Sequence, residues 1–309
     1  MPLAAARHAD AQWIPNLTVE QEPSLDWRFA AKDANEFALP FHVRNYVQPE
    51  RTTCEVFVPS RYKPDKPSAL VLYLSPGPRA RAGAIWRSTL QRQGVLYASP
   101  HDSGNAVPTG QRIRAAISVL HHMRTHYSID PDRTYIAGFS GGARIALLIA
   151  MAYPEYFGGA MPIGSGGRLR QESWLVERAE ARLRVALIVG TSDGFWPEVK
   201  RCTTTELKES GVDARLWMPI MGHELPKSAV FLGALRWLEE DLPRRRQLAK
   251  EFPATRIADS PTPQEWSQRL MDEAALRTSS PKTLRSGVML MKGIAARWPK
   301  TPAGRIAAE

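Results

Sequence analysis

TYIAGFSGGARIALLIAMA, residues 134–152, joins two different patterns through one short turn. Thr134–Ala137 has the β-branched, aromatic and small apolar residues of a short strand. Ala143–Ala152 is almost wholly apolar and has the length of a buried helix. Between them, residues 138–142 (GFSGG) fit the pattern G-x-S-x-G. The stretch therefore predicts a strand, a sharp turn with a serine at its tip, and a helix.

The same alternation of strands and helices continues on both sides of this stretch. Further strands are predicted at Thr52–Pro59, Ala69–Ser75, Val95–Ser99, Ala160–Gly164, Val185–Gly190 and Ala214–Met218. Helices are predicted at Ala82–Gln93, Gln111–Tyr127, Glu172–Arg178, Glu198–Ser210 and Lys227–Asp241, with a turn at Asp130–Arg133. Alternating elements indicate an α/β fold with a mostly parallel sheet and helices on both faces. Such a sheet binds ligands at the carboxyl ends of its strands, where functional residues are expected.

The two ends of the chain do not follow this alternation. Residues 1–50 lack a sustained period and are expected to form an irregular lead-in to a core at residues 51–243. Residues 244–309 predict an all-helical appendage. Helix starts with a proline in the first turn are predicted at Thr262–Glu265, Ser280-Pro281 and Thr301-Pro302.

The net charge of +10 on 309 residues comes mostly from this C-terminal extension. Residues 244–309 contain 13 Lys or Arg against 6 Asp or Glu, an excess of 7. Most are arginines spread along predicted helices, without the aromatic platforms or zinc-ligand spacing of nucleic-acid-binding modules. We interpret them as a solvated basic face, expect no nucleic-acid partner, and leave the partner of these helices open.

Cysteine content and hydropathy exclude several classes of protein. Cys54 lies in a predicted strand and Cys202 in a predicted helix, so we interpret both as buried free thiols rather than a disulfide framework or a metal cluster. No run approaches the roughly 18 apolar residues of a membrane span. The N-terminus lacks the apolar region of an intact signal peptide. A trimmed secreted or periplasmic protein would start in the same way, so these compartments and the cytoplasm both stay open.

The serine at the tip of the central turn, Ser140, is the candidate nucleophile. A hydroxyl on a sharp strand-to-helix turn is exposed at the sheet edge, and flanking glycines avoid clashes with the neighbouring backbone. The helix that follows places its positive N-terminal end beneath a forming oxyanion. We therefore predict that Ser140 attacks a carbonyl carbon.

A serine hydroxyl needs a base, and the base needs a carboxylate to orient it. His223 is the only histidine downstream of Ser140, and it follows a predicted strand. Asp193 follows another strand at the same predicted sheet edge. Glu198 is expected to begin a helix, and Glu224 is too close in sequence to the histidine to orient it. The predicted triad is Ser140, Asp193 and His223, in the chain order that this arrangement uses.

Two backbone N–H groups normally stabilise the oxyanion in such a site. The first belongs to the residue after the nucleophile, Gly141. The second is expected from the loop after the first buried strand, residues 75–79 (SPGPR), where the two prolines have no N–H. Gly77 is therefore the predicted second donor, with Ser75 in reserve.

Three more side chains are candidates for contact with a substrate. Phe195 and Trp196 lie just beyond the predicted acid and would line a pocket, or equally would be part of the core. His101 lies in a strand-end loop from which it could approach the site.

These motifs together resemble those of bacterial esterase families related to polyhydroxybutyrate depolymerases and feruloyl esterases. The likeness covers roughly Arg51 to Leu242 and rests on ALVLYLS (69–75), IDPDRTYIAGFSGGARIALLIAMAYPEYFGGAMPIGSG (129–166), LIVGTSDGFW (187–196) and MGHELP (221–226). It implies the α/β-hydrolase fold and an acyl-serine intermediate, with no metal or other cofactor. The families' nucleophile, acid and base fall on Ser140, Asp193 and His223. Their usual His-Gly after the first strand is replaced here by residues 75–77 (SPG).

From these residues we expect a serine hydrolase that cleaves a small or polymeric carboxylic ester. A serine peptidase with the same triad is one alternative. A non-catalytic binding protein that keeps the α/β-hydrolase fold is another, although an intact triad favours an enzyme.

Overall fold

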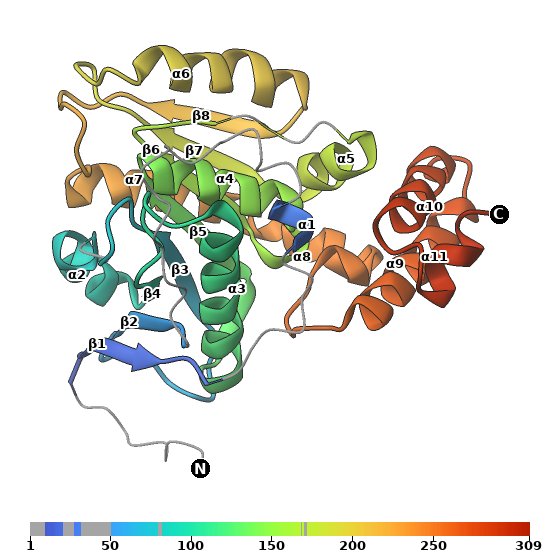
Figure 1. Cartoon of the computed structure of the whole chain (residues 1–309), viewed down its shortest axis with the longest axis horizontal. Helices are drawn as coiled ribbons and strands as arrows, with labels where there is room; N and C mark the ends of the chain where they lie inside the picture. Colours follow the sequence, from blue (N-terminus) through green and yellow to red (C-terminus); the bar gives the residue numbers. More distant parts are fainter. Residues whose placement is uncertain (1–9, 21–27, 32–50, 80–81, 168, 170–171) are drawn as a thin grey trace.

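The computed structural model describes residues 10–20, 28–31, 51–79, 82–167, 169 and 172–309, and its centre is an eight-stranded sheet (Figure 1). In spatial order the strands are β1 (Gln12–Thr18), β2 (Thr53–Val58), β4 (Leu96–Pro100), β3 (Ser68–Leu74), β5 (Ile129–Phe139), β6 (Gly159–Ile163), β7 (Arg184–Ile188) and β8 (Asp213–Trp217). Strand β2 is antiparallel to β1 and β4, and all other neighbours are parallel. The predicted α/β fold with a mostly parallel sheet is confirmed.

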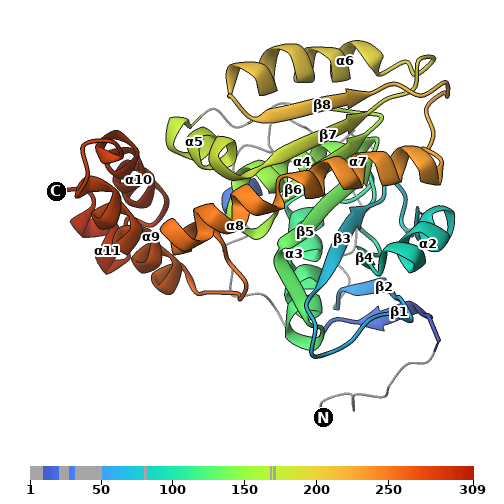
Figure 2. The ribbon, with the colours of Figure 1, turned by 180° about the vertical axis from the view of Figure 1, so that it is seen from behind.

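Helices cover both faces of this sheet (Figures 1 and 2). α3 (Thr109–His126) and α4 (Gly141–Ala152) pack on one face, and α2 (Ala82–Gln93) and α7 (Ser228–Glu240) pack on the other. Alternate strand residues enter two separate hydrophobic clusters, one on each face. The remaining helices of this part are α1 (Arg28–Ala31), α5 (Ser173–Arg182) and α6 (Trp196–Arg201), the last continued by a π-helical turn at Cys202–Leu207.

The first strand of the chain is one that the sequence did not predict. Gln12–Thr18 forms the sheet edge β1, and its pairing with β2 shifts register between Ile14 and Leu17. This irregularity, on a half-exposed edge strand, hides the alternation by which a strand is recognised. Most of the predicted lead-in 1–50 lies outside the described residues.

The turn predicted at residues 130–133, and the proline after the last predicted core helix, both belong to regular elements. Strand β5 begins at Ile129 and takes in the predicted turn at Asp130–Arg133, because its pairing with β3 has an irregular register there. Pro243 lies just beyond the predicted helix Lys227–Asp241. Helix α7 already ends at Glu240, and Pro243 lies in the first turn of α8 (Leu242–Glu251), where a proline fits without loss of a hydrogen bond.

The C-terminal helices α9 (Pro263–Thr278), α10 (Leu284–Arg297) and α11 (Pro302–Ile306) lie together at one end of the molecule (Figures 1 and 2). Helix α9 starts with the predicted capping box between Thr262 and Glu265. Buried residues of α9 and α10 belong to the same hydrophobic cluster as α3 and α4. Helix α8 runs across the expected boundary at residue 243, and the division into domains stays a prediction.

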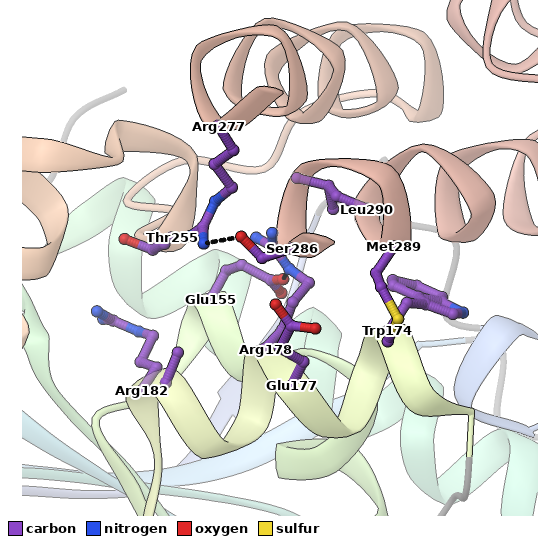
Figure 3. A pocket seen from close by; sticks show the side chains of 11 residues that line it. Glu155, Trp174, Glu177, Arg178, Arg182, Thr255, Arg277, Ser286, Met289 and Leu290 are labelled. Atoms are coloured by element: carbon purple, nitrogen blue, oxygen red, sulfur yellow. Dashed lines mark hydrogen bonds and ion pairs between the residues drawn. The ribbon is translucent and has the colours of Figure 1, made fainter. Parts of the chain in front are cut away.

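Where these helices meet α5, a buried arginine bridges the two parts (Figure 3). Arg178 pairs with Glu155 of the core and with Glu273 of α9, and all three side chains are almost fully buried. A small cavity of ≈ 60 Å³ lies beside them, lined also by Ser286 and Leu290 of α10. Two buried carboxylates without this guanidinium would be strongly unfavourable, so the contact favours docking of the helices.

The two cysteines are in the state that the sequence predicts. Cys54 and Cys202 are both buried and free, and burial raises the pKa of each thiol to about 12. Among the described residues, no helix combines the length and apolarity needed to cross a bilayer.

Strand β2 carries a carboxyl group that is buried within the sheet. Glu55 on β2 is 5% exposed, and its Oε1 accepts a hydrogen bond of 3.0 Å from the hydroxyl of Tyr97 on β4. Burial raises the pKa of Glu55 to about 7, and the hydrogen bond from Tyr97 offsets only part of this effect. The folded protein therefore holds a proton here that the unfolded chain loses near pH 4.5.

Glu55→Gln is expected to stabilise the protein at pH 8 by about 2–3 kcal/mol and to leave stability at pH 4.5 nearly unchanged. The free energy of unfolding of the wild type falls as the pH rises from 4.5 to about 7, because unfolding then releases the proton that the buried Glu55 holds. Glutamine does not ionise and has no such dependence on pH. Urea unfolding at both pH values measures the difference. Glu251→Gln, at an exposed position in α8, is the control, and a Glu55→Gln effect of equal size at both pH values would contradict the expectation.

Candidate active site

The turn at the carboxyl end of β5 has the geometry of a nucleophile elbow. Strand β5 ends at Phe139, helix α4 begins at Gly141, and Ser140 between them has φ 53° and ψ −123°. Such a positive φ is strained for a residue with a side chain. The Ser140 N–H donates to the carbonyl oxygen of Ile163 on β6 at 2.8 Å, which ties the turn to the neighbouring strand.

Close contacts between backbone segments explain the glycines at positions 138 and 142. A Cβ on Gly142 would lie 2.1 Å from the carbonyl oxygen of Leu74, at the end of β3. A Cβ on Gly138 would lie 2.3 Å from the carbonyl oxygen of Gly142. The start of α4 therefore packs directly on the end of β3, and only residues without a side chain allow this contact.

The structure brings the three predicted triad residues together. His223 Nε2 lies 2.9 Å from Ser140 Oγ, and His223 Nδ1 lies 3.0 Å and 2.9 Å from the two carboxylate oxygens of Asp193. The Asp193 side chain is fully buried, whereas His223 is one-third exposed. The carboxylate is thus shielded from water while the imidazole faces the solvent side, where a substrate would bind.

Two loops hold the acid and the base against each other. Thr191 N–H donates to the carbonyl oxygen of Pro219, and Ser192 N–H donates to that of Met221, so the loop after β7 is bonded to the loop after β8. A Cβ on Gly190 would lie 2.1 Å from the Met221 carbonyl oxygen, so these loops are in direct backbone contact. The distance between Asp193 and His223 is therefore set by backbone contacts between their loops.

Aromatic rings enclose the imidazole. The ring centroids of Phe139 and Phe195 lie 4.7 Å and 4.9 Å from that of His223. The Phe195 N–H also donates to Asp193 Oδ1 at 2.9 Å. Phe195, a candidate for substrate contact, is therefore at the site and 38% exposed. Phe139 was not among the predicted site residues, although its place beside the serine within the GFSGG turn is a signal for it.

The two other carboxylates weighed from the sequence lie elsewhere. Glu198 accepts hydrogen bonds from Arg144, from the Ser165 hydroxyl and from the Gly167 N–H. Burial opposes its ionisation, but the bonds from Arg144 and Ser165 and the charge of Arg144 outweigh burial and lower the pKa of Glu198 to about 2. Glu198 thus anchors the loop after β6. Glu224 is exposed and lies on the wall of the adjacent cleft.

Of the expected oxyanion donors, Gly141 and Gly77 differ in their surroundings. Gly141 is the first residue of α4, where an N–H has no carbonyl one turn earlier in the helix to bond. The Gly77 N–H donates to the Ser75 hydroxyl at 3.1 Å, and this hydroxyl in turn donates to the Arg79 carbonyl oxygen. The Gly77 hydrogen is therefore engaged within its own loop, and Ser75, the reserve, is 6% exposed.

The side chains of two other candidates have contacts away from His223 and Ser140. Trp196 is half-buried in the first turn of α6 and packs against the hydrophobic cluster of α3 and α4. His101 is 6% exposed, and its Nε2 lies 2.8 Å from the carbonyl oxygen of Pro15 on β1. This contact could not be foreseen because β1 was not predicted.

An open cleft of ≈ 690 Å³ lies next to the imidazole. Its walls come from the loop after β3, from α2 and from the loop that carries His223. The lining is mainly apolar and includes Tyr73, Pro76, Ile85 and Phe139. In the part of the chain that the structure describes, no group of three or more His, Cys, Asp or Glu side chains could hold a metal ion.

Comparisons with known proteins agree with this fold. No family model matches the chain. A segment of 48 residues, 16% of this chain, is 42% identical to poly(3-hydroxyalkanoate) depolymerase C of Paucimonas lemoignei, and it spans 12% of that protein's length. A ferulic acid esterase matches with a TM-score of 0.53 at 11% identity, over 75% of this chain and 99% of its own. An S-formylglutathione hydrolase of Staphylococcus aureus matches with a TM-score of 0.50 at 12% identity, over 77% and 99%.

The low sequence identities make these structural matches informative about fold alone. The chain has the α/β-hydrolase fold that the sequence predicts, so the predicted resemblance is confirmed at that level.

Gly142→Ala is expected to lower the free energy of unfolding by about 3 kcal/mol, because the new methyl group would meet the backbone of β3, which cannot turn away. Urea unfolding measures the change. The control is Gly233→Ala inside α7, where the nearest atom to a Cβ is 3.8 Å away and alanine should instead stabilise by about 0.5–1 kcal/mol. Equal stability of the two variants would contradict the backbone contact.

Proposed function

We propose that the chain is a serine esterase that hydrolyses carboxylic esters through an acyl-serine intermediate on Ser140. The observation that carries this proposal is the continuous contact from Asp193 through His223 to the hydroxyl of Ser140, all within 3.0 Å, on a strand-to-helix elbow. The names of two proteins that it resembles, a poly(3-hydroxyalkanoate) depolymerase and a ferulic acid esterase, fit an ester substrate.

Acylation begins with the hydroxyl of Ser140. The buried Asp193 accepts the Nδ1–H of His223, which fixes the tautomer whose Nε2 can accept a proton. Ser140 Oγ attacks the ester carbonyl carbon while its proton moves to Nε2, and the carboxylate stabilises the resulting imidazolium. The tetrahedral intermediate collapses as its bond to the alcohol oxygen breaks and the imidazolium returns the proton to the leaving alcohol.

Deacylation repeats these steps with water. His223 removes a proton from a water molecule, whose oxygen attacks the acyl-serine carbonyl. The second tetrahedral intermediate releases the carboxylic acid, and Ser140 recovers its proton. The exposed edge of His223 supports access for water, and the Gly141 N–H at the start of α4 is the proposed donor to both oxyanions.

The cleft beside His223 supports an ester with an apolar acyl or alcohol group. Phe139 and Ile85 line it, and its volume of ≈ 690 Å³ leaves room for a small ester or for one end of a polymer.

Ser140→Ala is expected to reduce turnover of a short-chain aryl ester by about five orders of magnitude, because the nucleophile is lost. Asp193→Asn is expected to reduce it by about four, because the imidazole loses its orienting charge. Initial rates with purified protein measure both, and circular dichroism checks the fold. Asp213→Asn on the exposed edge strand β8 is the matched control.

Undiminished hydrolysis by Ser140→Ala would overturn the proposal. Equal kcat/KM values for a peptide amide and its matched ester would move the assignment to a peptidase. A wild-type protein that hydrolyses neither substrate would instead favour the non-catalytic binding protein.

A further inference from the structure

The loop after β3 is where the second oxyanion donor is expected. At its bend, residues 76–78, no backbone N–H is free to bind an oxyanion. Pro76 and Pro78 have no N–H, and the Gly77 N–H is bound to the Ser75 hydroxyl. Hydrogen-bond donors fixed beside the developing charge commonly supply a large part of the catalysis of acyl transfer. If the proposed esterase activity holds, the site should therefore contain another donor close to Gly141.

A side-chain amide lies at that place. A Cβ built on Gly141 would be 2.0 Å from Asn105 Oδ1, 2.7 Å from its Cγ and 3.0 Å from its Nδ2. The Asn105 amide thus packs against the residue whose N–H is the first donor. Asn105 is exposed, so its amide is accessible to a bound molecule. A half-turn of the amide exchanges its oxygen and its NH2 group, so a donor can face a substrate oxyanion.

The loop that carries Asn105 is fixed to the proline-rich loop by backbone contacts. The Asn105 N–H donates to the Pro76 carbonyl oxygen at 2.8 Å, and the Asp102 N–H donates to that of Pro78 at 2.7 Å. A Cβ on Gly104 would lie 2.6 Å from the carbonyl carbon of Gly77. The two loops therefore form one unit beside the nucleophile.

A buried arginine donates hydrogen bonds to both of these loops. Arg112 of α3 donates from Nε to the Ser103 carbonyl oxygen at 2.7 Å, and from Nη2 to that of Ser75 at 3.5 Å. Its side chain is 6% exposed, so these bonds are shielded from water. The backbone position of Asn105 is thus set before a substrate arrives, which limits the positions that its amide can take.

We propose that the side-chain amide of Asn105 is the second oxyanion donor, together with the backbone N–H of Gly141. The amide donates one hydrogen bond to the oxygen that becomes negative when Ser140 attacks. No proton leaves the amide. Asn105 is therefore a catalytic residue whose contribution grows from the bound ester to the tetrahedral intermediate.

Asn105→Ala tests this role with an aryl ester as substrate. The expected result is a loss of 10²- to 10³-fold in kcat with KM changed by less than about threefold, because the lost bond strengthens only in the transition state. Asn105→Asp is nearly isosteric, has no N–H and adds a negative charge, so it should lose at least as much. Ala106→Ser, at the exposed neighbouring position, is the matched control and should keep wild-type kcat.

A thionoester of the same acid separates a donor from a residue that only supports the loop. Sulfur is a weak hydrogen-bond acceptor, so removal of an oxyanion donor should cost much less with the thionoester. The ratio of kcat/KM for ester over thionoester is expected to fall by about 10-fold or more in Asn105→Ala. A loop that is merely disturbed would slow both substrates equally.

The outcomes distinguish this inference from the proposed function. A wild-type protein without esterase activity would remove the proposed function itself. An active wild type with an Asn105→Ala variant within threefold of its kcat would overturn only the assignment of Asn105. A rise in KM at unchanged kcat, or an unchanged ester-to-thionoester ratio, would also overturn it.

Discussion

The turn at Ser140 is the constraint on which the rest of the site depends. Its positive φ is held because the Ser140 N–H bonds to Ile163 on β6 and because Gly142 meets the backbone of Leu74 on β3. One turn therefore fixes the ends of three neighbouring strands relative to one another. The neighbouring strands continue this edge of the sheet: Asp193 follows β7, His223 follows β8, and Asn105 follows β4. A side chain at Gly142 would separate α4 from β3 and move the nucleophile away from the proline-rich loop.

Around this turn the candidate groups are held by backbone contacts and by a partly buried ion pair. The loops of Asp193 and His223 bond to each other through the main chain, and Arg144 with Glu198 holds the loop after β6. Such a frame keeps the imidazole within hydrogen-bond distance of both partners before a substrate binds. The same arrangement leaves His223 partly exposed, so the substrate and the water of the proposed reaction can reach it. Preorganisation with access from one side is what two-step acyl transfer requires.

The sequence predicted the order of the central elements because each carries its own local signal. Apolar runs identified β3 to β8, and the glycines around Ser140 identified the elbow. Once the serine was located, the chain order of serine, acid and histidine led to Asp193 and His223. Strand β1 was missed because its pairing is irregular, and the contact between His101 and Pro15 followed from that strand. The engagement of Gly77 by Ser75 depends on how one loop bends, and the approach of Asn105 to Gly141 depends on how two loops pack. No residue pattern marks such contacts, since they join loops whose conformations are set by the assembled sheet.

Labelling with a fluorophosphonate, followed by peptide mapping, tests most directly the claim that this chain is a serine hydrolase. The reagent bonds covalently to a serine oxygen that a neighbouring base activates, so it reports the nucleophile without knowledge of the natural ester. The account predicts close to one adduct per chain, located on the peptide that contains Ser140, with a much slower reaction in His223→Ala. No adduct on the folded wild-type protein, or an adduct on another residue with Ser140 unmodified, would contradict it.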